Sequence, residues 1–416
     1  MQTNLAPEFK GTPQGLEAEA ILRKCVHCGF CTATCPTYQL LGDELDGPRG
    51  RIYLMKQVLE GHVPTRATQL HLDRCLTCRN CESTCPSGVE YGHLIDIVRP
   101  IVDDQVERPA REKATRWLLK EGLTSPLFAP AMKLGQALRP LVPAALKGKV
   151  PARPGARAHQ WPTRTHPRKV LMLMGCVQPA MMPNINSATA RVLDVAGIQT
   201  VVADEAGCCG AIRTHLNDTE GGLADMRRNI DAWWPLISGG PGALAGIEAI
   251  VMNASGCGVT VKDYGHALAR DPAYADKAAR ISELTRDLSE LLPDLVPRLK
   301  TKLRLRNLPT QLAFHPPCTL QHGQQLSGGV ESHLNALGFD VRLAPNESHL
   351  CCGSAGTYSV LQPELAQRLR DRKLANLAPL DAQTIVSANI GCIQHLQTGT
   401  STPVRHWIEV LDDALA

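Results

Sequence analysis

Two copies of one cysteine run constrain this chain more than any other feature of its sequence. The runs span residues 25–36 and 75–86, and both read C-x2-C-x2-C-x3-C-P. In this bacterial-type signature of [4Fe-4S] binding, three closely spaced thiolates wrap one cubane, and the fourth binds the other cluster. We therefore expect cluster 1 to take Cys25, Cys28, Cys31 and Cys85, and cluster 2 to take Cys75, Cys78, Cys81 and Cys35.

A structural zinc site is the alternative for any CxxC pair, because zinc takes four tetrahedral ligands and usually draws them from two separated pairs. Here each run already holds four cysteines and ends in proline, and the run occurs twice. The spacing therefore favours iron-sulfur clusters over zinc.

Length and composition limit the class of protein. The chain has 416 residues, which suits two or three domains, and 44% of them are hydrophobic. Aromatic residues make up only 4%, so no nucleic-acid partner is indicated, and the net charge of +4 argues neither for nor against a polyanionic partner. No signal peptide and no run of about 18 apolar residues is found. With 16 cysteines available as metal ligands, we expect a cytoplasmic protein whose membrane contact, if any, is peripheral on the inner face of the cytoplasmic membrane.

Residues 1–106 are expected to form a helical domain around the two runs. Helices are predicted at 17–22, from Pro48 to about residue 60, and at 91–101. Arg49 and Arg51 fall on the second of these helices. They would lie near a cluster or a partner, or else on an ordinary salt-bridged helix face.

Residues 107–169 concentrate the positive charge. They contain 14 Lys and Arg against three acids, and proline is frequent. Helices are predicted to about residue 147, followed by an irregular linker. The segment 127–149 is basic and amphipathic, which is typical of a helix on an anionic membrane or on a partner. The alternative is a helical hairpin that packs on its own domain.

From residue 170 the periodicity changes to two βα-rich repeats, 170–306 and 307–416, each with a parallel sheet. Strands are predicted at 170–174, 199–203 and 248–253 and again at 311–314, 340–343 and 384–387. Helices are expected at 186–196, 330–337 and 364–377. The insert 262–306 should be mostly helical, with apolar residues at helical spacing over 276–292.

Each repeat also carries four cysteines at matching places. They are Cys176, Cys208, Cys209 and Cys257 in the first repeat, and Cys318, Cys351, Cys352 and Cys392 in the second. All eight are predicted at strand ends or loops, where ligands of open α/β sheets gather. We favour a shared function of these cysteines in metal binding, cluster binding or redox chemistry, and the alternative is that they only pack in the core. Four thiolates would suffice for one further cluster in each repeat.

Both cysteine patterns resemble known domains. The spacing of the runs is similar to the helical ferredoxin domain of succinate dehydrogenase and heterodisulfide reductase subunits. The repeats resemble the cysteine-rich CCG domain of heterodisulfide reductase, C-x31–39-C-C-G-x35–36-C-x-x-C. The first cysteine of the closing CxxC is replaced here by Ala254 and by Asn389. Relatives that hold a non-cubane cluster use more thiolates than remain in this chain.

The complete chain resembles the iron-sulfur subunits of bacterial glycolate oxidase (glycolate dehydrogenase). The segments CVHCGFCTATCPTYQLLGDELDGPRGRIYLMK, CLTCRNCESTCPSGVEYGHLIDIVRP, NASGCGVTVKDYGHAL and LCCGSAGTYSVLQPELA carry the likeness. It implies an electron-transfer subunit that takes electrons from FAD on flavoprotein partners, which oxidise glycolate to glyoxylate, and passes them to an acceptor such as quinone. Subunits of related lactate or glycerol-3-phosphate dehydrogenases, and a thiol-disulfide reductase, are the alternatives.

The residues themselves indicate no catalytic site on this chain. No G-x-G-x-x-G opens a helix after a strand, so no flavin or nicotinamide site is predicted. His315 and His349 lie near CCG cysteines, but a lone histidine is more often an ordinary core or surface residue.

Overall fold

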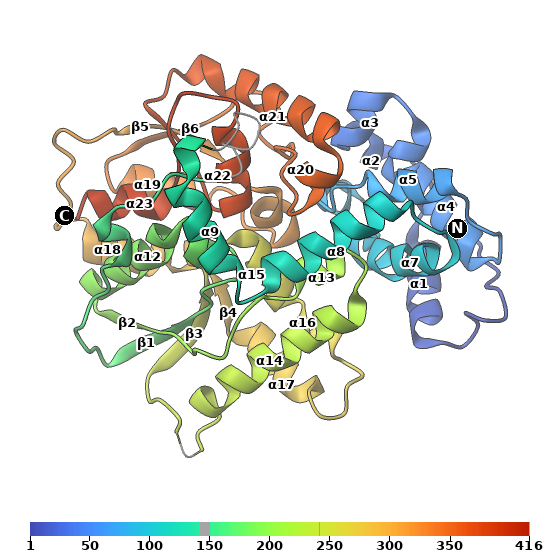
Figure 1. Cartoon of the computed structure of the whole chain (residues 1–416), viewed down its shortest axis with the longest axis horizontal. Helices are drawn as coiled ribbons and strands as arrows, with labels where there is room; N and C mark the ends of the chain where they lie inside the picture. Colours follow the sequence, from blue (N-terminus) through green and yellow to red (C-terminus); the bar gives the residue numbers. More distant parts are fainter. Residues whose placement is uncertain (142–149, 241, 416) are drawn as a thin grey trace.

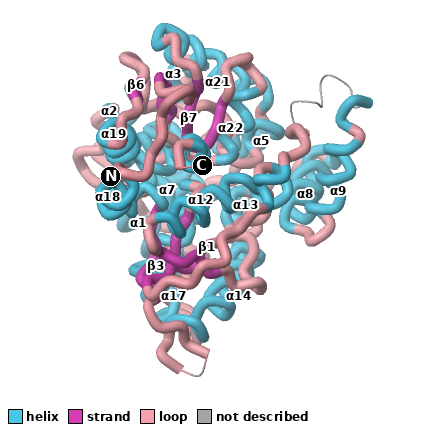
Figure 2. The backbone as a smooth tube through the Cα atoms, turned by 90° about the vertical axis from the view of Figure 1, so that its left-hand side faces the viewer, coloured by secondary structure: helices cyan, strands magenta, loops and turns pink. Residues whose placement is uncertain are grey.

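The fold was obtained as a computed structural model that describes residues 1–141, 150–240 and 242–415. A helical N-terminal part lies beside two α/β halves, and α8 and α9 run from it across one face of the repeats (Figure 1). Each half contains one four-stranded, all-parallel sheet, and Figure 2 shows the two sheets in separate parts of the molecule. The predicted fold class, a helical ferredoxin-like domain with two parallel α/β repeats, is confirmed.

The N-terminal part is built from short helices that begin at clear sequence signals. Pro13 and Pro48 occupy the first position of α1 and α4, where a missing N–H costs nothing, and the Thr12 side chain caps α1. Apolar faces of α1, α4 and α7 form one core, which includes Leu22 and Met55. The elements are α1 (Pro13–Lys24), α2 (Phe30–Ala33), α3 (Pro36–Leu41), η1 (Glu44–Asp46), α4 (Pro48–Leu59), α5 (Arg66–Asp73), α6 (Asn80–Thr84) and α7 (Tyr91–Gln105).

The basic segment forms α8 (Ala110–Thr124), α9 (Phe128–Ala137) and the short turns η2 (Arg139–Leu141) and η3 (Ala156–His159). The part of the predicted helix at 142–147 lies outside the described residues. Many cations of this segment pair with acids of other elements: Arg108 with Asp73 at 2.6 Å and Lys120 with Asp218 at 3.1 Å. These ion pairs therefore link the segment both to the N-terminal part and to the first repeat.

The two sheets have the same strand order, β2-β1-β3-β4 and β6-β5-β7-β8. Val170 of β1 pairs with Thr200 of β2 and with Ala249 of β3. The strands are β1 (Arg168–Met172), β2 (Ile198–Val201), β3 (Ile247–Met252), β4 (Thr285–Asp287), β5 (Gln311–His315), β6 (Asp340–Leu343), β7 (Thr384–Ser387) and β8 (Val404–His406). In each sheet the chain leaves the first strand to one side and later returns to the other, which makes a topological switch point at its carboxyl edge.

Helices cover both sheets, and one core spans the two repeats, with Val251 and Phe314 among its members. The first half has α11 (Gln178–Met181), α12 (Pro183–Val195), α13 (Ala211–His215), α14 (Thr219–Ile237), α15 (Ser255–Lys262), α16 (Tyr264–Ala267), α17 (Ala275–Leu284), η4 (Leu288–Leu291) and α18 (Leu292–Leu299). The second has η5 (Thr319–Gly323), α19 (Gly329–Ala336), α20 (Tyr358–Leu361), α21 (Pro363–Leu377), η6 (Ala378–Leu380), α22 (Ile390–Gln397) and α23 (Trp407–Asp413).

Two sequence-based expectations were wrong in detail. The apolar spacing over 276–292 does not mark one helix, because α17 ends at Leu284 and β4 follows before the chain coils again. Cys257 and Cys392 do not lie in loops at strand ends but in the first turns of α15 and α22. Hydrogen bonding of β4 to β3 is a non-local effect that the local apolar pattern does not reveal.

Candidate metal centres

The first group of thiols joins the first three cysteines of run one to the last cysteine of run two. Burial raises the pKa of Cys31 to about 11, and the nearby Cys25, Cys85 and Cys28 thiols add to the shift. Left-handed backbone at His27 and Gly29 turns the loop tightly enough for these thiols to converge. The second run has the same geometry, with left-handed backbone at Thr77 and Arg79 in the matching positions.

The second group joins the first three cysteines of run two to Cys35. The pKa of Cys81 is raised well above its usual value by burial and by Cys78, Cys75 and Cys35. Cys35 directly precedes α3, and Cys85 directly follows α6. The Cys85 thiol lies near Cys31 and the Cys35 thiol lies near Cys81, so the last thiol of each run joins the group of the other run. Each N-terminal group thus offers four sulfur donors, which is the ligand number and type that a [4Fe-4S] cluster takes.

A buried ion-pair network supports the second group. Arg51 and Asp46 are each only 1% exposed and lie 3.5 Å apart, and Asp46 also bonds Arg74 at 2.8 Å. Burial works against the charge of Arg51, but Cys75, Tyr91 and Cys35 more than offset it, so its pKa is raised. Arg51 is therefore a permanent cation beside the second group, whereas Arg49 forms a half-exposed pair with Glu44 at 2.6 Å.

The third group gathers the four cysteines of the first repeat at the carboxyl edge of its sheet. Cys176 follows β1, Cys208 and Cys209 follow β2, and Cys257 follows β3. The pKa of Cys208 is lowered by hydrogen bonds from Cys176, Cys209 and the Gly210 N–H. The same contacts and burial raise the pKa of Cys176 and Cys209.

The fourth group repeats this arrangement in the second repeat. The Cys318 and Cys351 sulfurs are 3.7 Å apart, and the Gly353 N–H points to the Cys351 sulfur at 3.4 Å. A hydrogen bond from Cys351 lowers the pKa of Cys352, but the bond to Cys392 and burial outweigh it and raise that pKa well above its usual value. All eight cysteines of the repeats therefore lie in two groups of four.

The glycine of each CCG triplet is required by the backbone. Gly353 has φ of 89°, and a Cβ there would lie 2.6 Å from the Ala366 carbonyl oxygen on α21. Gly210 is the counterpart, with φ of 97° and the Gly222 carbonyl 2.9 Å away. Only glycine combines a left-handed turn with such close packing, and the turn aims the paired thiols at the sheet edge.

The second and fourth groups are neighbours across the junction between the N-terminal part and the second repeat. The Cys318 thiol contributes to the raised pKa of Cys78, and the Cys78 thiol to that of Cys351. Leu76, Cys318 and Cys351 belong to one small buried cluster, against which Cys78 packs. The junction is fixed by polar bonds as well, since Ser83 Oγ lies 2.8 Å from Nδ1 of His322.

A chamber of about 1510 Å³ lies between the second, third and fourth groups of thiols. Seven of the eight repeat cysteines line it, as does Cys78, and apolar side chains of α8 and α9 such as Leu123 and Phe128 form another wall. Several titratable residues also line it, and burial shifts two of them strongly: it raises the pKa of Asp96 to about 6 and lowers that of His215 to about 4. The volume exceeds that of an ordinary ligand pocket.

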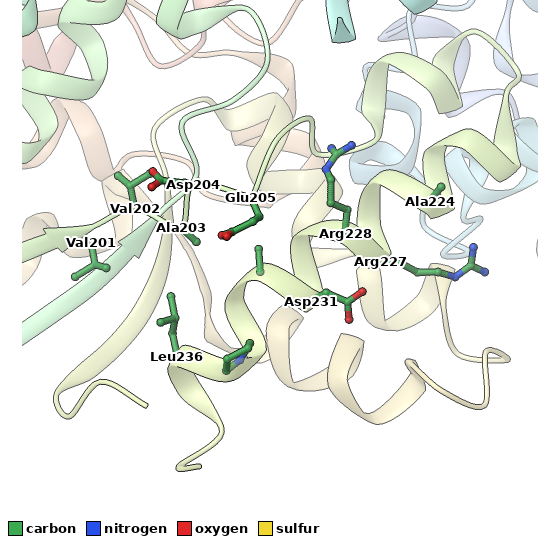
Figure 3. A pocket seen from close by; sticks show the side chains of 12 residues that line it. Val201, Val202, Ala203, Asp204, Glu205, Ala224, Arg227, Arg228, Asp231 and Leu236 are labelled. Atoms are coloured by element: carbon green, nitrogen blue, oxygen red, sulfur yellow. The ribbon is translucent and has the colours of Figure 1, made fainter. Parts of the chain in front are cut away.

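A second hollow of about 870 Å³ lies between the end of β2 and α14 (Figure 3). Its arginines bond acids nearby, Arg227 to Asp271 and Arg228 to Asp225, both at 2.8 Å. The described residues that line it include no cysteine. It therefore offers no thiolate to an iron-sulfur cluster.

Comparison with known proteins assigns a family to this geometry. A 4Fe-4S dicluster domain model matches residues 21–89, and a cysteine-rich domain model matches residues 170–262 and 312–397. The chain is 55% identical over 416 residues to the glycolate oxidase iron-sulfur subunit of Escherichia coli K12, a match that covers 100% of this chain and 99% of that protein. The chain belongs to the family of glycolate oxidase iron-sulfur subunits.

Two more distant relatives also match most of the chain. The probable glycolate oxidase iron-sulfur subunit of Bacillus subtilis strain 168 is 30% identical over 92% of this chain and 89% of its own length. A fumarate reductase (CoM/CoB) subunit of Methanothermobacter marburgensis is 25% identical over 97% of this chain and 74% of its own length. The resemblance inferred from the sequence is confirmed, and the chain is an iron-sulfur protein with [4Fe-4S] clusters and an electron-transfer role.

Sequence reasoning found all 16 cysteines but missed two features around them. The first feature is the burial of Arg51. The sequence does not distinguish Arg51 from Arg49 on the same helix, but the fold buries Arg51 beside the thiols and leaves Arg49 half-exposed. The second feature is the common chamber, which no sequence signal marked. Among the described residues, no helix combines the length and apolar character needed to cross a membrane.

Proposed function

We propose that this chain relays electrons from the FAD-containing flavoprotein subunits of a glycolate oxidase complex to an acceptor such as quinone. Oxidation of glycolate to glyoxylate releases two electrons and two protons on the flavoprotein, and this chain contributes no catalytic residue to that step. The observation that carries the proposal is that the thiol groups follow one another in space. The first N-terminal group lies in the same small domain as the second, and the second adjoins the group of repeat two.

The ligand sets we propose are those of the thiol groups. Cluster 1 would be held by Cys25, Cys28, Cys31 and Cys85, and cluster 2 by Cys75, Cys78, Cys81 and Cys35. When bound, such clusters accept and release single electrons. The chain supplies sulfur ligands, burial and the Arg51 cation, which stabilises a more negative reduced cluster. In this proposal the chain has four parts: the helical ferredoxin domain at 1–106, the basic linker at 107–169, and the two CCG repeats at 170–306 and 307–416.

We propose that electrons enter at the first group, where the flavoprotein docks. Among the thiols of the described residues only Cys28 is classed as exposed. Two apolar side chains flank it, Val26 at 68% exposure and Phe30 at 60%. Exposed apolar side chains grouped around a redox centre are typical of a partner-binding surface.

Replacing Phe30 with serine is therefore expected to weaken association with the flavoprotein and to slow cluster reduction by glycolate, by about 10-fold or more if Phe30 is an interface hot spot. Co-purification and stopped-flow absorbance measure the two effects, with iron content unchanged. Val63→Ser is the control. Val63 is 82% exposed but follows the far end of α4, a 12-residue helix about 18 Å long. Equal effects of both variants would contradict the assignment.

We propose that the third and fourth groups bind further iron-sulfur centres. Four thiols converge in each. In the second repeat all four are buried, and a buried lysine, Lys373, adds a compensating charge nearby. Cys209→Ala and Cys352→Ala are each expected to lower the iron content of the anaerobically purified complex and to remove one set of EPR signals. If iron and spectra stay unchanged in both, the repeat cysteines are structural.

Quinone as acceptor is supported by the chamber. An apolar wall from α8 and α9 suits a hydrophobic ring and tail, and Asp96 and His215 are titratable groups on the same chamber. Reduction of a quinone to a quinol consumes two electrons and two protons, so both redox centres and proton donors are needed.

A peripheral contact with the inner face of the cytoplasmic membrane would bring such an acceptor to the chamber. The outer faces of α8 and α9 leave Trp117 and Leu118 more than 60% exposed, together with Leu127 and Leu134. Arg111 and Lys133 are also exposed there. Basic residues among exposed apolar ones are typical of helices at anionic membrane surfaces.

The complex is therefore expected to co-sediment with vesicles that contain anionic phosphatidylglycerol and less with pure phosphatidylcholine. Trp117→Ser combined with Leu118→Ser should reduce this binding several-fold. Val360→Ser serves as the control, because Val360 is 42% exposed on α20 in the second repeat. Absence of vesicle binding by the unmodified complex would contradict the membrane contact.

A thiol-disulfide reductase is the second candidate. The 3.7 Å separation of the Cys318 and Cys351 sulfurs favours it, since paired thiols of this kind can exchange with a disulfide. Disulfide reduction by the isolated chain without any flavoprotein would support it. The other alternative is a subunit of a related lactate or glycerol-3-phosphate dehydrogenase. Measuring which substrate reduces the complex, glycolate, lactate or glycerol-3-phosphate, distinguishes this alternative from the main proposal.

A further inference from the structure

His315 is a buried histidine beside the fourth group of thiols. It is the last residue of β5 and only 1% exposed. Within the part of the chain that the structure describes, neither ring nitrogen has a partner. A buried polar atom without a hydrogen-bond partner destabilises the folded state, so an additional group that bonds the imidazole at this place would be favourable.

The position of the imidazole identifies that group. One ring nitrogen and the sulfurs of Cys352 and Cys392 all lie within 4.8 Å of one another. Metal–sulfur bonds of about 2.3 Å and metal–nitrogen bonds of about 2.0 Å let one metal ion bridge atoms at separations of this order. Imidazole nitrogen is an established ligand of iron in iron-sulfur centres.

The two repeats differ at this place. Three residues before the first cysteine, the first repeat has Leu173, which is buried and carries no donor atom. In the second repeat, Asn389 occupies the position of the absent fifth cysteine, and its side-chain oxygen accepts the Gly391 N–H at 3.0 Å. The fourth group therefore has a nitrogen donor that the third group lacks.

Other polar groups nearby are already engaged. The Lys373 ammonium donates to the carbonyl oxygens of Glu347 at 2.6 Å and Ser348 at 3.2 Å. His395 bonds the Ala366 carbonyl at 3.0 Å. These contacts leave His315 as the imidazole that faces Cys352 and Cys392.

We propose that His315 is a nitrogen ligand of the metal centre in the second repeat, in addition to Cys318, Cys351, Cys352 and Cys392. The two repeats then hold centres of different composition, one with sulfur ligands and one with sulfur and nitrogen. This inference rests on the proposed function of the repeat cysteines as iron ligands.

The test is pulsed EPR of the reduced complex, purified anaerobically with and without 15N-histidine labelling. The unmodified complex should show a histidine nitrogen coupling that changes with the isotope. His315→Leu, which copies the first repeat, should lose it. His349→Gln should keep it, because His349 lies on the same loop as Cys351 without belonging to the group. His315→Cys should retain iron, lose the coupling and lower the midpoint potential, since thiolate adds negative charge.

Each outcome is decisive. A histidine coupling that persists in His315→Leu, or that is absent from an iron-loaded second repeat, overturns the ligand assignment alone. Iron content that is the same in Cys352→Ala and in the unmodified complex shows that the second repeat binds no iron. That result overturns both this inference and the proposed function of the repeat.

Discussion

Replacing Cys81 with serine is expected to abolish glycolate-dependent reduction of a quinone analogue by the complex while the flavin still becomes reduced. Changing an outer-shell partner of a metal site costs about 10–100-fold, so loss of a direct ligand should exceed about 100-fold. Cys81 is a half-buried member of the second group, the one that adjoins the repeats. Steady-state turnover and rapid-scan flavin absorbance measure the two halves of the reaction separately.

Cys31→Ser should have the same effect from the first group. Thr34→Ser is the matched control, because Thr34 lies in the same run and serine keeps the hydroxyl that bonds the Cys31 carbonyl at 3.4 Å. Normal turnover of either cysteine variant would exclude the relay through these groups. A variant that also fails to reduce its flavin would point to loss of assembly and would count against the separation of oxidation and relay.

Asp46→Ala is expected to be the most destabilising single change in the N-terminal part. Asp46 is 1% exposed and neutralises Arg51, while its second oxygen bonds Arg74 at 2.8 Å. Removing one partner of a buried ion pair costs about 3–5 kcal/mol, and here Arg51 would stay buried without its carboxylate partner. The melting temperature of the complex, followed by cluster absorbance under anaerobic conditions, should fall markedly.

Glu44→Gln supplies the comparison. It breaks the Arg49 pair, whose partners are 37% and 40% exposed, and such pairs contribute at most about 1 kcal/mol. A fall in melting temperature that is similar for both variants would show that the buried network does not stabilise the second group.

Most of the fold could be predicted because its signals are local. The strand 384–387 and the helix 364–377 agree with β7 and α21 to within one residue. Neither β4 nor β8 was predicted, since each has three residues and exists through pairing with β3 or β7. Short edge strands carry too few residues for a period-2 pattern to emerge.

The candidate sites also contain features that the sequence predicts and features that only the fold reveals. Cysteine spacing indicated the membership of the groups, because the reach of a short loop decides which thiols can share a cluster. The location of Arg51 and the chamber could not be predicted, since both depend on how helices far apart in the sequence pack. His315 looked like an ordinary core histidine until the fold left its nitrogens without partners beside Cys352 and Cys392 among the described residues.

Residue spacing alone was enough to establish an iron-sulfur protein with two cysteine runs and two CCG repeats, because thiol spacing and strand periodicity are properties of neighbouring residues. How these parts meet depends on the tertiary structure. It places Cys78 of the second run against Cys318 and Cys351 of the second repeat, and it leaves Cys28 at the surface. Proximity between segments more than 200 residues apart arises from packing of buried apolar faces, and no local pattern encodes it.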